Sequence, residues 1–197
     1  MGMPSHPFDE FCFIDDKLRP GARVGSAEVI GGFPAFLQRP GEQTLVVIAV
    51  GFPTVRYRLA EKLRAAGLNL GSVVDASVIR RPTCELQPGV VVGPSCFLSC
   101  DVCIGENAVV NTDTVIGHDS VIGAHSVLAR CSVGGGVVMG EGVEVGAGAT
   151  FFPEVRVGAW SKIAMGASVF QDVPPNVTVA GNPARVISKR EPGWHLQ

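Results

Sequence analysis

The sequence is short of charge, of aromatic residues and of long apolar runs. Only 17% of its 197 residues are charged, the formal net charge is −2, and there is a single Tyr. Because 46% of the residues are hydrophobic, a disordered chain is excluded, and the lack of net positive charge argues against a nucleic-acid partner. No apolar run approaches the roughly 18 residues that span a bilayer, and the first residues contain no signal-peptide core. We therefore expect a soluble, cytoplasmic protein without membrane insertion.

Cysteine gives no indication of a disulfide framework or of a metal site. The six Cys lie in a chain of 197 residues without an export signal, so we expect free thiols that pack as small hydrophobic residues. The spacing of Cys96, Cys100 and Cys103 could suggest zinc, but neighbouring repeats direct these side chains differently and no fourth ligand is evident. A zinc carbonic anhydrase would need three converging His, and the repeats contain two. We expect no bound metal.

The excess of glycine, with 25 residues, belongs to an internal repeat of six residues. A period of six fits neither a helix nor a simple alternating strand, but it is typical of a parallel β-helix with three short strands in each coil of about 18 residues. Residues 86–174 then form about five coils. A Val-rich sandwich would instead show turn signals every 8–12 residues or so. The repeated aliphatic positions are Leu86, Val92, Leu98, Ile104, Val110, Ile116, Ile122, Leu128, Val133, Met139, Val145, Phe151, Val157, Ile163 and Val169.

The first 70 residues follow a different pattern. Residues 11–14 and 44–50 are predicted strands, the second of them a buried parallel strand. Thr54 could cap a helix over residues 55–66 that ends at Gly67, with Val55, Leu59 and Leu63 on one face. This order predicts a small α/β domain over residues 1–70, a β-helix over 71–175 and a tail over 176–197. The tail contains several Pro, so we expect an irregular wrap there.

Polar residues that interrupt the repeat indicate where chemistry could occur. Asn111, His118 and Asp119 lie within nine residues, and His118 follows the inward Ile116 by two positions, so it faces outward. An imidazole can accept a proton near neutral pH, and a carboxylate can orient it. A solvated surface His remains an equal alternative on these residues alone. The second His of the repeat, His125, is interpreted as a surface residue.

The stretch from Asp75 to Ile187 resembles the left-handed β-helix acyltransferases. It is most similar to the sugar acetyltransferases of the bacillosamine N-acetyltransferase and sialic-acid O-acetyltransferase type. Their active segment reads Asn-x-x-x-x-(Val/Ile)-x-His-(Asp/Glu)-x-x-Ile-Gly, which residues 111–123 match at each named position. The closing segment MGASVFQDVPPNVTVAGNPARVI matches the family's C-terminal signature. Asp15-Asp16 and AVGFPTVR at residues 49–56 resemble parts of its Rossmann-like nucleotide-sugar domain, here truncated.

The resemblance implies a mainly β fold, a left-handed parallel β-helix, and an acetyl-CoA-dependent acetyltransferase that acts on a sugar, nucleotide-linked in the family. It implies His118 as general base, Asp119 as its partner, and acetyl-CoA bound between the chains of a homotrimer. Direct transfer also needs a backbone N–H donor for the oxyanion, for which Gly135 and Gly136 are candidates. The expected substrate-binding residues are Asn111, Asp15, Asp16, Gly51 and Arg56. The expected cofactor-binding residues are Gly135, Gly136, Lys162, Gly166, Arg185 and Lys189.

Three departures from the family leave a second hypothesis open. The Gly-rich turn that contacts the nucleotide is absent, Val127 stands where many relatives have a second active-site His, and the repeat shortens to five residues between Leu128 and Val133. This shortening implies a deletion at the coil that faces His118. The alternative function is a non-catalytic trimeric scaffold or binding module. Residue types alone do not distinguish an amino from a hydroxyl acceptor, nor identify the sugar.

Overall fold

The computed structural model describes residues 10–38 and 44–196. The chain divides into two compact units, Met1–Thr44 and Leu45–Gln197. This division differs from the expected boundary at residue 70, because the strand, helix and strand that follow Thr44 belong to the larger unit. No helix in the described ranges is both long enough and apolar enough to cross a membrane.

The smaller unit contains a three-stranded mixed sheet and one short helix. Its strands are β1 (Cys12–Ile14), β2 (Arg23–Val24) and β3 (Ala27–Gly31), in the order β1-β3-β2. β1 runs parallel to β3, as a strand of an α/β unit would, whereas β2 is antiparallel to it. Helix α1 (Phe33–Leu37) follows. The strand predicted at residues 11–14 is confirmed, but a Rossmann-like parallel domain is not.

The larger unit begins with a strand–helix–strand segment: β4 (Leu45–Val46), α2 (Pro53–Ala65) and β5 (Asn69–Leu70), with β4 parallel to β5. The expected strand over residues 44–50 is thus only two residues long. The helix begins earlier than expected, because Pro53 occupies its first turn and Phe52, not Thr54, is the N-cap residue. Its buried face is Pro53, Arg56, Ala60 and Leu63. Gly67 ends it at a φ of 71°, as predicted.

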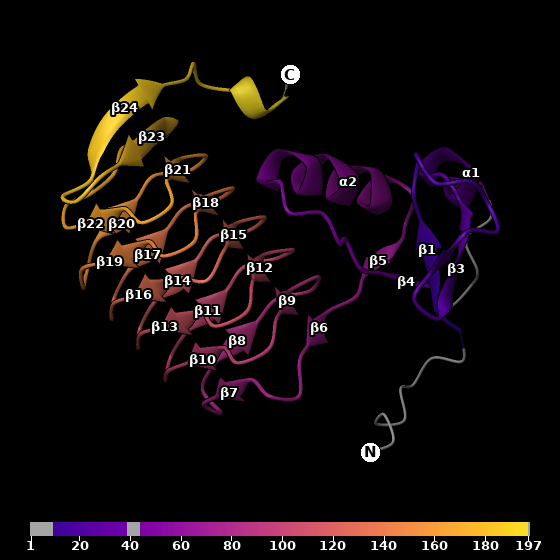
Figure 1. The fold of residues 1–197 in the computed structure, drawn as a ribbon, viewed down its shortest axis with the longest axis horizontal. Helices are drawn as coiled ribbons and strands as arrows, with labels where there is room; N and C mark the ends of the chain where they lie inside the picture. Colours follow the sequence, from indigo (N-terminus) through magenta and orange to yellow (C-terminus); the bar gives the residue numbers. More distant parts are fainter. Residues whose placement is uncertain (1–9, 39–43, 197) are drawn as a thin grey trace. The chain divides into compact units, whose positions relative to one another are not determined.

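The β-helix consists of three faces of stacked two-residue strands (Figure 1). Face one contains β6 (Val73–Val74), β9 (Val91–Val92), β12 (Val109–Val110), β15 (Val127–Leu128), β18 (Glu144–Val145) and β21 (Lys162–Ile163). Face two contains β7 (Ile79–Arg80), β10 (Phe97–Leu98), β13 (Val115–Ile116), β16 (Ser132–Val133), β19 (Thr150–Phe151) and β22 (Ser168–Val169). Face three contains β8 (Glu85–Leu86), β11 (Cys103–Ile104), β14 (Val121–Ile122), β17 (Val138–Met139) and β20 (Arg156–Val157). The predicted parallel β-helix is confirmed, and it begins two strands earlier than the repeat suggests.

The second residue of each strand points into the prism and forms its core. Leu98 pairs with Ile116, and Ile116 with Val133, so one aliphatic side chain stacks on the next along the axis. These residues are at most 4% exposed. At the open N-terminal end, Arg80 occupies the same register position and is exposed, which explains why the aliphatic repeat is not visible before Leu86. All six cysteines are free thiols, and Cys84, Cys96 and Cys131 are buried.

Three corners join the faces, and each contains a tight turn whose second residue has a positive φ. The corner between faces two and three, here the His118 corner, contains His118 followed by Asp119 at a φ of 58°. The corner between faces three and one, the His125 corner, contains Asn107 and His125 at φ of 55° and 60°. The Asn111 corner, between faces one and two, contains Asn111 and the shortened step around Arg130. That shortening therefore lies at a different corner from His118, contrary to the expectation.

The C-terminal segment is a regular hairpin, not the irregular wrap expected from its prolines. β23 (Val177–Ala180) continues face one parallel to β21, and β24 (Arg185–Lys189) turns back antiparallel to β23. Its prolines fall outside the two strands, so the backbone pairing is preserved. A single 3₁₀ turn, η1 (Trp194–Leu196), then contacts α2.

Candidate active site

His118 and Asp119 form an exposed pair at their corner. They follow β13 directly, and His118 Nδ1 lies 2.6 Å from Asp119 Oδ2. Both side chains are 64% exposed. Because an ionised carboxylate only accepts hydrogen bonds, Asp119 selects the tautomer with the proton on Nδ1. The Nε2 lone pair of His118 is then available to accept a proton from a substrate.

The backbone of this corner is fixed from both neighbouring coils. Asp119 N–H donates to Cys100 O in the preceding coil at 3.1 Å, and Gly136 N–H donates to His118 O from the following coil at 2.7 Å. Ser120 Oγ adds a bond of 3.0 Å to Gly134 O. The exposed imidazole therefore stands on a rigid base, which is what a positioned proton acceptor requires.

Gly135 lies directly against the His118 ring. A Cβ added to Gly135 would come within 2.6 Å of Nε2 and 2.7 Å of Cε1, so only glycine leaves room for the ring in this orientation. Gly136 provides the positive φ of 69° that the turn needs. Within the described ranges, the Gly135 N–H donates to no backbone carbonyl, whereas its carbonyl accepts from Glu154 N–H at 2.9 Å. A backbone donor thus stands beside the proposed base.

Asn111 lies at another corner of the same chain. It follows β12, its side chain is exposed, and strand β13 separates it from His118. Its backbone N–H donates to Leu128 O at 2.8 Å, and its carbonyl accepts from Cys96 Sγ at 3.0 Å. One copy of the chain does not place Asn111 beside His118.

Asp15 and Asp16 of the smaller unit accept hydrogen bonds from backbone N–H groups of the same unit. Asp15 Oδ1 accepts from the N–H groups of Lys17 and Leu18 at 2.7 and 2.9 Å, and these bonds lower the pKa of Asp15. Asp16 Oδ1 accepts from Phe33 N–H at 2.7 Å, at the first turn of α1. In the larger unit, Gly51 lies in the loop before α2 with open space beside its Cα.

Arg56, one of the expected substrate-binding residues, is enclosed by protein groups. It is fully buried, and its guanidinium donates to the carbonyls of Ile48, Val50 and Asn107 as well as to Asn107 Oδ1. Burial lowers the pKa of Arg56 to about 10, so the group stays charged at neutral pH. Its role is to hold the loop before α2 against the β-helix.

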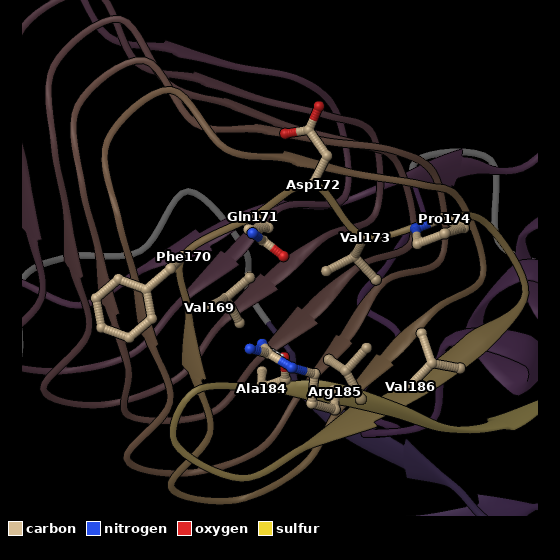
Figure 2. A pocket seen from close by; sticks show the side chains of 10 residues that line it. Val169, Phe170, Gln171, Asp172, Val173, Pro174, Ala184, Arg185 and Val186 are labelled. Carbon is tan, nitrogen blue, oxygen red and sulfur yellow. Dashed lines mark hydrogen bonds between the residues drawn. The ribbon is translucent and has the colours of Figure 1, made fainter.

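The expected cofactor-binding cations lie toward the C-terminal end of face one. Lys162 on β21 forms an ion pair with Glu144 at 2.7 Å. Arg185 and Lys189 begin and end β24, and both are exposed. Arg185 lines a small hollow of about 110 Å³, where its side chain extends toward Val169 while the Asp172 carboxylate points away (Figure 2). Gly166 turns the Asn111 corner at a φ of 67°, beside open space.

His125 was interpreted from the sequence as a surface residue, but in the structure it is buried. It is 4% exposed, its Nδ1 lies 3.0 Å from Asn107 Nδ2, and the Tyr57 ring packs edge-on against it at 5.4 Å. Burial is the main reason that its pKa is lowered. The sequence signal was its spacing of one coil from Asn107, which places both at the same corner.

The thiols of the Cys96–Cys103 segment do not converge. Cys96 is buried, Cys100 is exposed at the His118 corner, and Cys103 points outward from β11. No group of three His, Cys, Asp or Glu side chains suited to a metal ion occurs in the part of the chain that the structure describes.

Comparisons with known proteins identify the family. No family model and no curated protein matches the sequence. Among solved structures, a mutant of perosamine N-acetyltransferase from Caulobacter crescentus, in complex with CoA and GDP-perosamine, is 30% identical with a TM-score of 0.82. The match covers 86% of this chain and 82% of that one.

Two further structures agree. WeeI from Acinetobacter baumannii AYE is 27% identical over 90% of this chain and 85% of its own, with a TM-score of 0.83. The acetyltransferase domain of PglB from Neisseria gonorrhoeae FA1090 is 25% identical over 91% and 88%, with a TM-score of 0.70. With its left-handed β-helix, its His118–Asp119 pair and these relatives, the chain belongs to the hexapeptide-repeat family of sugar N-acetyltransferases and is an acyltransferase.

Proposed function

We propose that this protein transfers the acetyl group of acetyl-CoA directly to an amino group of a nucleotide-linked sugar, with His118 as the general base. The observation that carries the proposal is the His118–Asp119 pair, in which Asp119 takes the hydrogen bond of Nδ1 and leaves the lone pair on Nε2 of a largely exposed side chain beside Gly135. Solved relatives were crystallised with CoA and GDP-perosamine or with acetyl-CoA, which supports this pair of substrates. The amino sugar in GDP-perosamine favours an amine over a hydroxyl acceptor.

His118 performs both proton transfers in this reaction. Nε2 removes a proton from the acceptor nitrogen as that nitrogen attacks the thioester carbonyl, and a tetrahedral oxyanion forms. The Gly135 N–H is the candidate donor to that oxygen. When the carbon–sulfur bond breaks, the protonated imidazole returns its proton to the departing CoA sulfur. The products are the N-acetylated sugar and CoA, and His118 is neutral again.

Asp119 orients the imidazole and stabilises its charged form. Both side chains are largely in water, where such a pair contributes only about 0.2–1 kcal/mol to folding stability. Its value is catalytic, because Asp119 holds Nδ1–H and keeps the lone pair on the side where the acceptor binds. The carboxylate also lies beside the positive charge that develops on His118 during transfer.

The active assembly that we propose is a homotrimer with sites between chains. Apolar side chains point outward from the faces on both sides of the His118 corner: Ile79 and Val115 on face two are 60% and 43% exposed, and Val121 on face three is 40% exposed. Packing of these faces against other copies would bury them. It would also allow Asn111 of one chain to approach His118 of the next, which a single chain does not achieve.

The remaining contacts belong to the same proposal. Asp15, Asp16 and Gly51 would bind the nucleotide part of the acceptor. Lys162, Gly166, Arg185 and Lys189 would contact acetyl-CoA, the three cations at its phosphates. Acetyl-CoA is a co-substrate of the cytoplasm, which is where we place the protein.

The test is CoA release from acetyl-CoA with a panel of GDP-, UDP- and dTDP-linked amino sugars. We expect turnover by the wild type and a loss of about 10²–10⁴-fold in kcat for His118→Ala. Asp119→Asn should lose about tenfold or more, since the amide holds the imidazole less strongly. The matched control is Asp101→Asn, which removes a carboxylate from the same corner one coil earlier and should leave the rate unchanged. CoA binding without turnover on any acceptor would favour the scaffold.

A further inference from the structure

The His125 corner contains a buried chain of hydrogen bonds that the catalytic proposal does not use. It links Arg56 on α2, Asn107 in the turn after β11, and His125 in the turn after β14. All three residues are at most 4% exposed. Buried polar groups that are fully paired fix local structure strongly, and each unpaired one carries a large cost.

The orientation of each group follows from Arg56. A guanidinium only donates, so the Asn107 atom that it contacts must be the carbonyl oxygen, Oδ1. The other end of the amide, Nδ2, then donates to Arg56 O at 3.1 Å and to His125 Nδ1 at 3.0 Å. His125 Nδ1 is therefore an acceptor, and its proton lies on Nε2, which is 3.8 Å from Glu141 Oε1.

A second proton on His125 is incompatible with this arrangement. It would place Nδ1–H against the N–H groups of Asn107, two donors with no acceptor between them. If Asn107 rotates its amide to accept from Nδ1, its nitrogen faces the Arg56 guanidinium, again donor against donor. Either outcome breaks the chain of hydrogen bonds at Asn107.

The surroundings of His125 carry charges of both signs. Glu106 and Glu61 favour its protonation, while Arg56 and Arg64 oppose it. Glu141 faces Nε2, and the Tyr57 ring lies edge-on against the imidazole. Removal from water outweighs these charges and lowers the pKa of His125, so the neutral form is the resident one at neutral pH.

The chain of hydrogen bonds ends on the loop that precedes α2. Arg56 Nη1 donates to the carbonyls of Ile48 and Val50, the latter at 3.0 Å, so it holds residues 48–52 against the β-helix. This loop includes Gly51, one of the proposed acceptor contacts. We propose that the Arg56–Asn107–His125 chain is a pH-sensitive positioning element: it holds residues 48–52 in place while His125 is neutral, and protonation of His125 releases them.

Hydrogen–deuterium exchange of the full-length protein tests this directly. After correction for intrinsic exchange, we expect residues 48–58 of the wild type to lose about three- to tenfold in protection between about pH 7.5 and pH 5.5, and tenfold is about the most that one proton can supply over that interval. His125→Asn supplies an acceptor oxygen near the place of Nδ1 but does not titrate, so its protection should not change with pH. His195→Asn, which removes an imidazole that is not part of this chain of hydrogen bonds, should keep the wild-type dependence of protection on pH. A pH-independent wild type, or an unchanged dependence in His125→Asn, would overturn the proposal.

Asn107→Asp provides an independent variant. A carboxylate accepts from the guanidinium and also from Nδ1–H, so the protonated His125 becomes the favoured partner and the pH dependence should reverse. Dependence that stays as in the wild type would contradict the proposal even if His125→Asn does not fold.

A kinetic measurement rests in addition on the proposed function. Over the same pH interval the KM for the acceptor should rise about fivefold more in the wild type than in His125→Asn, where only protonation of the acceptor amine contributes, while the KM for acetyl-CoA stays constant in both. If no acceptor is turned over at any pH, the proposed function fails, and the exchange experiment still decides the role of His125.

Discussion

Two histidines seven residues apart, on adjacent corners of one β-helix, have opposite environments. The His118 side chain occupies the first position of its turn and is 64% exposed, whereas the His125 side chain occupies the second position of the next turn and is 5% exposed. Tyr57 of α2 covers His125, and the Trp160 ring packs edge-on to Tyr57 at 5.7 Å. The repeat builds equivalent corners, and the segment that covers a corner decides whether its histidine is available for chemistry.

The hydrogen-bond partners differ in the same sense. His118 Nδ1 faces a carboxylate, which favours a proton on Nδ1 and stabilises the positive charge that His118 carries during catalysis. His125 Nδ1 faces an amide N–H, which requires a neutral ring. A carboxylate partner thus makes a base that can cycle through its charged form in place, and an amide partner makes a structural residue whose hydrogen bonds break when it is protonated.

The largest expected effect on the free energy of unfolding comes from Arg56, which is buried at the His125 corner, compared with an exposed arginine of the same helix. Arg56→Met removes a buried donor that serves three carbonyls and an amide oxygen, so we expect a loss of about 3–5 kcal/mol in the free energy of unfolding. Arg58→Met, on the exposed side of the same helix, should change it by about 0.5 kcal/mol or less. Urea unfolding of both variants measures this difference. Equal losses would show that the buried network does not stabilise the fold.

Gly135→Ala tests whether activity at the His118 corner depends on the room that Gly135 leaves for the His118 ring. The new methyl would lie 2.6 Å from Nε2 and displace the ring, so we expect kcat to fall about 10–10²-fold with little change in melting temperature. In a His118→Ala background the same change should cost nothing further, because the ring that it displaces is absent. Additive losses in the double variant would mean that Gly135 acts independently of His118.

The smallest expected effect is the pH dependence of folding stability. The pKa values of His125 and His195 are lowered in the folded protein from about 6.5, so below that pH the unfolded chain binds more protons than the native one. Stability should therefore fall as the pH drops below about 6.5, and His125→Asn should reduce that fall. Thermal melting across this range measures it, and an unchanged slope in the variant would contradict the assigned burial.

The β-helix was predictable from the sequence because each coil repeats the same local rule. One aliphatic residue every six positions specifies the inward face, and 15 positions satisfy it with one slip. The pattern is lost where that rule does not apply. Arg80 breaks the pattern at the open end, where an inward position is still wet, and the hairpin of β23 and β24 is stabilised by pairing with β21 that no local signal announces.

The site was predictable only where its parts are neighbours in the chain. His118 and Asp119 are adjacent in one turn, and the contact of Gly135 with His118 follows from the coil length. The burial of His125 depends on α2, which precedes it by about 60 residues. Of the helix face predicted from the sequence, Leu63 is buried and Val55 is exposed. Arg56 was assigned to the substrate because AVGFPTVR at residues 49–56 resembles part of a nucleotide-sugar domain, and its carbonyl partners appear only in the fold.

The central claim is that the exposed corner acetylates an amino sugar. The most direct measurement is mass spectrometry of GDP-linked amino sugar incubated with acetyl-CoA and either the wild type or His118→Ala. We expect a single acetyl group on the sugar nitrogen, resistant to hydroxylamine as an amide is, and formed about 10²–10⁴-fold more slowly by the variant. A hydroxylamine-sensitive ester, or acetylation by His118→Ala at the wild-type rate, would contradict the account.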